Sequence, residues 1–242
     1  MTKITTAMVL AAGLGTRMRP LTDDRPKALV EVAGRALIDH MLDRLAAAGV
    51  TRAVVNVHHF ADKVEAHLAA RRGGPEILIS DERAGLLDSG GGIAHALPLL
   101  GTDPIFVANI DTPWIEGEVP ALQALADTFD PAKMNIAVLL APRERSYGFE
   151  RPEGFDRDAE GRLTHSNSTD PLPAYVNIGF QALDPAVVAD RPDGPFSIVP
   201  IWKDLAARGR LYGAVMDGFA MHVSDPAARH IVEKRMLEGA AG

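Results

Sequence analysis

A short stretch near the N-terminus combines glycines with cations in a way that predicts an anion-binding site. The apolar run 8–11 leads into Gly13 and Gly15. The cations that follow are Arg17, Arg19, Arg25 and Lys27. Glycines at the end of a strand let the backbone approach a ligand, and consecutive N–H groups in such a turn cradle phosphate oxygens. Arg17 and Lys27 would add full positive charges, although a glycine turn beside ordinary surface cations is the alternative.

The two common phosphate loops do not fit this stretch. Started at Gly13, both the dinucleotide fingerprint and the P-loop need a glycine where Met18 stands. The spacing therefore predicts a phosphate site of another kind.

A second glycine run suggests contacts with a nucleotide. Residues 90–92 are three glycines that precede a predicted helix over 93–100. Such a run would leave backbone N–H groups free beside a helix N-terminus, where anions and polar ligands bind. A flexible loop that caps the helix is the alternative interpretation.

A third segment carries a carboxylate suited to a metal. The apolar run 104–110 is typical of a buried strand and delivers Asn109 and Asp111 to its carboxyl end. Mg²⁺ prefers oxygen ligands and shares them with substrate phosphates, so Asp111 is a candidate ligand. Asp111 as a turn or cap residue is the alternative.

The elements between these segments predict how they are positioned. Apolar spacing predicts helices over 37–48 and 61–70, and short apolar runs predict strands at 53–57 and 76–80. Strand and helix alternate, which predicts a parallel sheet with right-handed crossovers and with ligands at the carboxyl ends of its strands. The fold class is therefore α/β, a Rossmann-like, mostly parallel sheet flanked by helices.

The second half of the chain is less regular. A helix is expected near 119–129 and a buried strand at 135–141, whereas the polar composition of 142–173 indicates hairpins and loops. A strand at 174–183 and a helix at 198–207 follow. Asp217-Gly218 predicts a hairpin of strands 211–216 and 219–223, and Asp225-Pro226 predicts the start of a helix over 227–238.

Composition limits the class of protein. The chain has 242 residues, no cysteine and a net charge of −7, so one α/β domain without disulfides or thiolate chemistry is expected, in the cytoplasm. The acidic balance argues against nucleic-acid binding, and no apolar run is long enough to span a membrane. A basic loop on an acidic protein predicts a small anionic ligand.

The N-terminal stretch also resembles a known family. LAAGLGTRMRPLT followed by RPKALVEV is similar to the nucleotide-binding signature of sugar-1-phosphate nucleotidyltransferases. The residues that carry this resemblance are Gly13, Gly15, Arg17, Pro20, Leu21, Thr22, Pro26 and Lys27. The order of an acid, a serine and three glycines at 88–92 is similar to the short branch that includes N-acetylmuramate-1-phosphate uridylyltransferases and mannose-1-phosphate guanylyltransferases.

The resemblance implies a GT-A-like fold, one domain over 1–242, and roles for particular residues. Its nucleotide part would span about 1–141, a sugar-side lobe about 142–223 and a C-terminal helix about 225–238. The implied nucleotide-binding residues are Leu10, Ala11, Ala12, Gly13, Gly15, Arg17, Lys27, Gly90 and Gly91. The implied substrate-binding residues are Asn109, Asn177 and Gly179, and the implied catalytic residues are Arg17, Lys27 and Asp111. Asn177 and Gly179 are equally compatible with ordinary edge-strand positions.

The metal-binding end departs from the family pattern. The usual Asn-Gly-Asp triplet is Asn109-Ile110-Asp111 here, and the second metal carboxylate of the family falls on His222. The expected Mg²⁺ ligands are therefore Asp111 and His222. Asp225 is a possible substitute, but an aspartate before a proline at a helix start is typical of an N-cap.

The reaction implied is Mg²⁺-dependent condensation of a nucleoside triphosphate with a sugar 1-phosphate, which gives a nucleotide sugar and pyrophosphate. Uridylyl transfer to an amino-sugar 1-phosphate of cell-wall metabolism is expected. Guanylyl or cytidylyl transfer to mannose 1-phosphate or a phosphocholine-like acceptor, and a non-catalytic nucleotide-sugar-binding module, are the alternatives. The partners are then these two small molecules, without nucleic acid or membrane, for a monomer or small homo-oligomer.

Overall fold

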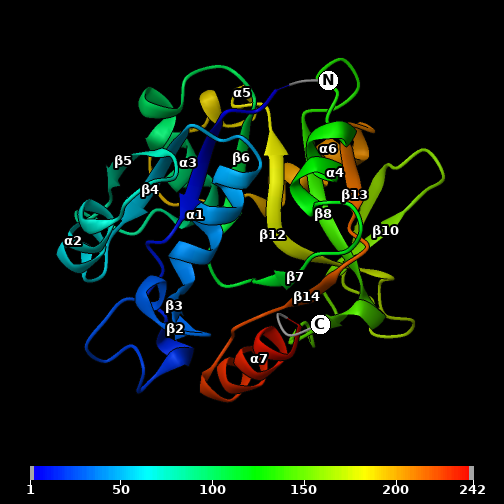
Figure 1. Cartoon of the computed structure of the whole chain (residues 1–242). Helices are drawn as coiled ribbons and strands as arrows, with labels where there is room; N and C mark the ends of the chain where they lie inside the picture. The colour runs from blue at the N-terminus through cyan, green and yellow to red at the C-terminus, as the bar shows by residue number, and fades with distance from the viewer. Residues whose placement is uncertain (1–2, 240–242) are drawn as a thin grey trace.

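The computed structural model describes residues 3–239, and its centre is a nine-stranded sheet (Figure 1). The strand order is β11-β10-β12-β6-β1-β4-β5, with β8 beside β12 and β13 beside β8. The bounds are β1 (Thr6–Leu10), β4 (Arg52–Val57), β5 (Glu76–Asp81), β6 (Ile105–Asn109), β8 (Ile136–Pro142), β10 (Gly154–Arg157), β11 (Leu163–Ser166), β12 (Tyr175–Leu183) and β13 (Leu211–Val215). β6, β1, β4 and β5 are parallel, whereas β12 is antiparallel to both β6 and β8. The predicted α/β fold with a mostly parallel sheet is confirmed.

Two small sheets and the helices complete the fold. The small sheets contain β7 (Trp114–Ile115), β14 (Phe219–Met221) and β9 (Ser146–Tyr147), and β2 (Glu31–Val32) with β3 (Arg35–Ala36). The α-helices are α1 (Leu37–Ala47), α2 (Ala61–Ala70), α3 (Asp88–Leu100), α4 (Ala121–Thr128), α5 (Ala186–Ala189), α6 (Val199–Ala207) and α7 (Pro226–Gly239). Short 3₁₀ turns are η1 (Thr16–Met18), η2 (Lys27–Leu29) and η3 (Arg143–Arg145).

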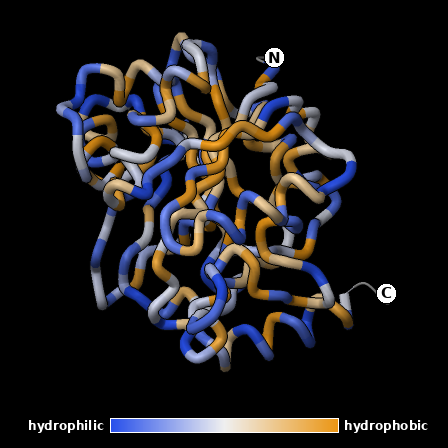
Figure 2. Tube along the Cα trace, turned by 90° about the vertical axis from the view of Figure 1, so that its left-hand side faces the viewer, coloured by the Kyte–Doolittle hydropathy of each residue, from blue (hydrophilic) through white to orange (hydrophobic). Residues whose placement is uncertain are grey.

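Helices cover both faces of the large sheet because its strands are apolar on both sides. Along β1, Ala7 and Val9 belong to one core and Met8 to the other, as the alternation of side chains in a strand requires. Helices α1, α2 and α4 contribute to the first core, and α3, α5 and α6 to the second. The hydrophobic segments accordingly lie largely in the interior in Figure 2, with hydrophilic segments at the periphery.

The strand order places a ligand site beside β1. β4 and β5 follow on one side of β1, whereas β6 lies on its other side. Connections therefore leave the carboxyl ends of β1 and β6 in opposite directions, which opens a crevice in sheets of this type. Leu10 and Asn109, the last residues of the two strands, are paired in register at this point.

The predicted hairpin of 211–216 and 219–223 is wrong. β13 lies in the large sheet, parallel to β8, and β14 lies between β7 and β9 in a separate sheet. The Asp217-Gly218 turn is held by other partners: the Asp217 carboxylate accepts the amide N–H of Glu118 at 2.9 Å, and Gly218 lies against the carbonyl of Ile115. The turn therefore moves the chain from one sheet to another.

Candidate active site

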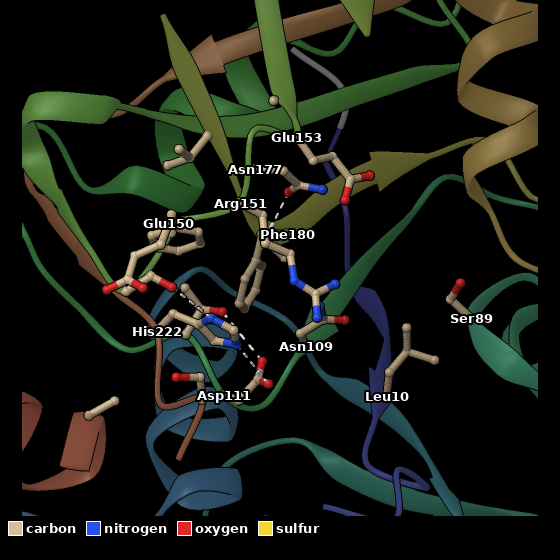
Figure 3. A pocket seen from close by; sticks show the side chains of 18 of the residues that line it. Leu10, Ser89, Asn109, Asp111, Glu150, Arg151, Glu153, Asn177, Phe180 and His222 are labelled. Atoms are coloured by element: carbon tan, nitrogen blue, oxygen red, sulfur yellow. Dashed lines mark hydrogen bonds and ion pairs between the residues drawn. The ribbon is translucent and has the colours of Figure 1, made fainter. Parts of the chain in front are cut away.

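A cavity of about 730 Å³ opens beside the carboxyl ends of β1 and β6 (Figure 3). The predicted site residues that line it are Leu10, Arg17, Asn109, Asp111, Asn177, Gly179 and His222. The others, Ala11, Ala12, Gly13, Gly15, Lys27, Gly90 and Gly91, lie outside this lining. The structure thus gathers residues from both halves of the chain around one space.

Asp111 is the centre of a charged cluster in this cavity. Its Oδ2 atom accepts a hydrogen bond from Lys27 Nζ at 2.6 Å and lies 3.4 Å from His222 Nε2 (Figure 3 shows the imidazole facing the carboxylate). The side chains of Lys27 and Asp111 are 12% and 20% exposed. Burial raises the pKa of Asp111, but the Lys27 and His222 side chains outweigh it and hold this pKa below its ordinary value of 3.8. The carboxylate is therefore ionised at neutral pH.

Backbone pairing brings His222 to Asp111. The N–H of Val223 donates to the carbonyl of Asp111 at 2.9 Å, and that of His222 donates to the carbonyl of Tyr147 at 2.9 Å. Gly148, with φ +83°, makes room for this strand because a Cβ there would lie 2.8 Å from the carbonyl oxygen of His222. The segments around Gly148 and His222, more than seventy residues apart in the sequence, thus lie side by side next to Asp111.

The orientation of the imidazole is compatible either with a ring that donates to Asp111 from Nε2 or with a metal ion between the two side chains. His222 Nδ1 lies 3.2 Å from the carbonyl oxygen of Gly148, which only accepts, so Nδ1 carries a proton. A neutral ring then directs the lone pair of Nε2 toward the negative Oδ2 of Asp111. A metal ion between the two atoms would remove this repulsion, as would a second proton on the ring. Among the described residues no group of three or more acidic or histidine side chains surrounds a metal position.

Asp225 has a structural role. Its Oδ1 accepts the amide N–H of Ala228 at 2.9 Å and its Oδ2 accepts the Ser224 hydroxyl at 2.8 Å, so the predicted N-cap of α7 is confirmed. The Ala228 amide is the main cause that lowers the pKa of Asp225, and the charge of Arg17 contributes to the same shift. Arg17 therefore lies on the side of the cavity where α7 begins.

The four cations of the N-terminal stretch lie in different surroundings, two at the surface, one in the cavity lining and one beside Asp111. Arg19 and Arg25 pair with the exposed carboxylates of Asp23 and Asp24. Arg17 lines the cavity, and Lys27 reaches Asp111. The loop itself is fixed at Gly15, which has φ +62° and whose carbonyl accepts the hydroxyl of Thr22 at 2.9 Å. A Cβ at Gly15 would lie 3.0 Å from that of Lys27, so this glycine lets the two segments approach.

The amides of Ala11 and Ala12, at the end of β1, are hydrogen-bonded inside the protein. Their N–H groups donate to Oδ1 of Asn56 at 2.7 and 3.2 Å. Asn56 Nδ2 donates to Glu82 at 2.7 Å, and the second carboxylate oxygen of Glu82 accepts the N–H of Leu87 at 3.2 Å. Asn56 and Glu82 are 3% and 2% exposed. This buried network joins the end of β1 to Leu87, which precedes α3 and its glycine run. The sequence offered only one signal for it, a polar residue inside the apolar run 53–57.

The glycine run also differs from the expectation. Helix α3 begins at Asp88, and the N–H groups of Gly90 and Gly91 both donate to the carbonyl of Phe196, at 2.9 and 3.0 Å. A Cβ at Gly90 would lie 2.4 Å from the Phe196 ring. These glycines therefore allow close packing of residues 194–198 on α3, and their amides are already hydrogen-bonded.

On the opposite side of the cavity, Asn109, Asn177 and Gly179 form a local unit. Gly179 has φ +77° at an irregularity in the pairing of β12 with β8, and its N–H donates to Oδ1 of Asn177 at 2.8 Å. A Cβ at Gly179 would lie 2.7 Å from Asn109 Nδ2. β12 as a whole lies between other strands, but Asn177 pairs only with Leu140 of β8 and Gly179 lies at the irregularity, so the strand pairing does not decide between a binding role and an ordinary strand position for these residues.

Replacement of Gly179 by alanine tests this unit. We expect Gly179→Ala to lower the free energy of unfolding by about 2–3 kcal/mol, because it combines left-handed strain with displacement of Asn109, and to weaken acceptor binding. The matched control is Gly34→Ala, which has a similar φ of +73° but nothing within 4 Å of a new Cβ. The free energy of unfolding of Gly34→Ala should fall by only about 1 kcal/mol, and this variant should keep full activity. Equal losses in chemical denaturation would contradict the role of the Asn109 contact.

Comparison with known proteins gives a consistent assignment. Residues 7–213 match the model of the MobA-like NTP transferase domain. An N-acetylmuramate alpha-1-phosphate uridylyltransferase of Caulobacter vibrioides is 54% identical over 96% of this chain and 97% of its own. The mannose-1-phosphate guanylyltransferase catalytic subunit beta of Drosophila melanogaster is 27% identical over 92% of this chain and 60% of its own.

A solved structure agrees on the fold. UDP-glucose pyrophosphorylase in complex with UDP-glucose superposes with a TM-score of 0.81 at 15% identity, over 97% of this chain and 99% of the other. Within residues 3–239, the structure contains no helix with the length and apolar character that a bilayer crossing requires.

Proposed function

The chain belongs to the MobA-like NTP transferase family as a sugar-1-phosphate nucleotidyltransferase, and from this premise we propose that it transfers a uridylyl group from UTP to N-acetylmuramate 1-phosphate. The observation that carries the choice of substrates is the 54% identity to the Caulobacter vibrioides uridylyltransferase, which extends over nearly the full length of both chains. The reaction would serve cell-wall sugar metabolism.

In this proposal the transfer needs no covalent intermediate. An oxygen of the sugar 1-phosphate attacks the α-phosphorus of UTP, the bond to the β-phosphate oxygen breaks, and pyrophosphate leaves. Because the attacking oxygen is already anionic, the protein needs to align the reactants and neutralise charge. In this proposal Lys27 neutralises charge that develops at the α-phosphate, and Arg17, on the cavity wall, stabilises the leaving pyrophosphate.

The carboxylate of Asp111 fits a magnesium ion better than the imidazole beside it does. Mg²⁺ commonly takes one or two carboxylates together with substrate phosphates, whereas the His222 nitrogen, 3.4 Å from Asp111 Oδ2, is a ligand type that softer divalent metals prefer. We propose Asp111 and His222 as the ligands of the Mg²⁺ ion. When bound, the ion would supply Lewis-acid stabilisation of the phosphate oxygens. We assign Asp225 to the N-cap of α7, where its two oxygens accept the Ser224 hydroxyl and the Ala228 amide, and not to the metal.

The rest of the site divides between the two substrates in this proposal. Residues 1–141 serve the nucleotide, with the loop at 10–15 near the phosphates, and about 142–223 serve the sugar, with Asn109, Asn177 and Gly179 as contacts. Gly90 and Gly91 would shape the nucleotide side through packing. UTP is a cytoplasmic metabolite, so we place the reaction in the cytoplasm.

A substrate panel tests the proposal. Purified protein with Mg²⁺ is given UTP, GTP, CTP or ATP against N-acetylmuramate, N-acetylglucosamine, glucose and mannose 1-phosphates, and pyrophosphate release is measured. We expect UTP with N-acetylmuramate 1-phosphate to have the highest kcat/KM. A preference for GTP with mannose 1-phosphate, or for CTP, would overturn the assignment of substrates. Addition of a chelator should abolish turnover, and restoration by Mg²⁺ checks the metal.

A further inference from the structure

Two arginines line the cavity, and they lie on opposite sides of it. Arg17 belongs to η1 and lies where α7 begins, near Asp225. Arg151 belongs to the loop that joins β9 to β10, and its side chain points into the cavity in Figure 3. One cation is thus on the side of the loop at 10–15 and the other on the side of β10 and β12.

The guanidinium of Arg151 has no partner within the described chain. Among residues 3–239 the structure records neither an ion pair nor a hydrogen bond for this group, whereas Arg143, Arg157 and Arg210 donate to backbone carbonyls. The neighbouring carboxylate of Glu153 lies 3.1 Å from His165 Nε2. The charge of Arg151 is therefore available to a ligand.

The loop that carries Arg151 is held in place by Arg143. Arg143 donates to the carbonyl of Phe149 at 2.8 Å, to that of Arg151 itself at 3.4 Å, and to that of Pro173 at 2.8 Å. A third contact inside the loop joins Arg143 to the carbonyl of Glu153 at 3.4 Å. The backbone of the loop is thus held by several hydrogen bonds, and these fix the backbone position from which the Arg151 side chain extends.

A guanidinium binds carboxylates and phosphates as a two-pronged donor. The reacting phosphates are expected near Lys27, Asp111 and Arg17, which leaves a different anion for Arg151. N-acetylmuramate differs from N-acetylglucosamine in a lactyl ether that ends in a carboxylate. We propose that Arg151 binds this carboxylate and thereby selects an acidic amino-sugar 1-phosphate over its neutral counterpart, an inference that rests on the proposed uridylyltransferase function.

The two acceptors form a matched pair for the test. Wild-type protein, Arg151→Met and Arg151→Lys are assayed with UTP and either N-acetylmuramate 1-phosphate or N-acetylglucosamine 1-phosphate. We expect Arg151→Met to lower kcat/KM for the acidic acceptor about 10- to 100-fold, as loss of a charged hydrogen-bonded pair does, with the KM for UTP unchanged. The neutral acceptor should be used as well as by wild type. Arg151→Lys should recover part of the loss.

A second arginine controls for loss of surface charge. Arg145 donates to the carbonyl of Asp217 at 2.8 Å and does not line the cavity, so Arg145→Met should leave both acceptors unaffected. If the neutral acceptor turns over too slowly, its inhibition constant against the acidic acceptor gives the same comparison.

The possible outcomes distinguish a failure of the proposed role of Arg151 from a failure of the proposed uridylyltransferase function. An equal loss for both acceptors would assign Arg151 to the sugar phosphate and overturn the inference, as would an Arg151→Met variant with unchanged selectivity. Wild-type turnover of UTP with the neutral acceptor alone would also overturn it while retaining uridylyl transfer. Failure of wild type with UTP and both acceptors would overturn the proposed function itself.

Discussion

Replacement of Asp111 by asparagine should lower kcat about 100-fold or more while the protein stays folded. The substitution keeps the shape of the side chain but removes the charge that meets Lys27 at 2.6 Å and faces His222 at 3.4 Å. Loss of one preorganised group that acts on developing charge costs about this much. Pyrophosphate release with UTP and N-acetylmuramate 1-phosphate measures the effect, and near-wild-type turnover would contradict the site.

The control for this variant is Asp23→Asn. Asp23 also pairs with a cation, Arg19, but both side chains are more than half exposed, so the pair is screened by solvent. Asp23→Asn should therefore leave both turnover and stability nearly unchanged. Circular dichroism confirms that each variant is folded before its kinetics are compared.

The same variant changes how stability depends on pH. Because the folded state holds the pKa of Asp111 below 3.8, the ionised carboxylate adds stability that is complete above this value and is lost as pH falls toward the lower folded-state pKa. In metal-free buffer, the difference in unfolding free energy between wild type and Asp111→Asn should be constant near neutral pH and shrink in acid below about pH 4. A difference that persists unchanged to pH 2 would contradict the ionised assignment.

Local patterns predicted the parts of the molecule that local interactions determine. The apolar run before Gly13 forms β1, the run before Asp111 forms β6, and Asp225 caps α7 through a bond to a residue three positions away. Each depends on neighbours in the sequence. The alternation of strands and helices then limits how the sheet is ordered. For this reason a site at the carboxyl ends of the strands could be predicted from the sequence.

Interactions between distant segments were not predictable in this way. Asp217-Gly218 is a hairpin signal, but contacts with Glu118 and Ile115 decide where the following strand pairs. A glycine run is equally suited to free amides and to close packing, and Phe196 determines which occurs. No spacing rule connects Asn56 with Glu82, because the two residues come from adjacent strand ends that only the folded sheet brings together.

That network leads to the second large effect. Asn56→Ala would leave the amides of Ala11 and Ala12 and the carboxylate of Glu82 buried without their partner. Unsatisfied buried groups cost about 1–3 kcal/mol each, so we expect the free energy of unfolding to fall by about 3 kcal/mol or more. The Kd for UTP should also rise, because the phosphate loop loses its anchor. Chemical denaturation and calorimetric titration with UTP measure the two effects.

Asn135 offers a control of the same residue type. Its side chain bonds to Asp184 and Arg210 and lies outside the cavity lining. Asn135→Ala should lower stability but leave the Kd for UTP unchanged. A parallel loss of UTP binding in both variants would mean that Asn56 acts only through general stability.

An exchange of the two polar groups separates positioning from packing. In Asn56→Asp alone, the new carboxylate still accepts the amides of Ala11 and Ala12 but faces Glu82, so like charges repel and stability falls. In the double variant Asn56→Asp with Glu82→Gln, the amide introduced at position 82 donates to the carboxylate at position 56, and its oxygen accepts the N–H of Leu87. The hydrogen bond between positions 56 and 82 and the bond from Leu87 are then both kept and the net charge is conserved, since the two side chains have only exchanged roles. We therefore expect the double variant to recover most of the stability and UTP affinity lost in Asn56→Asp, and losses that simply add would show that the two residues are not coupled.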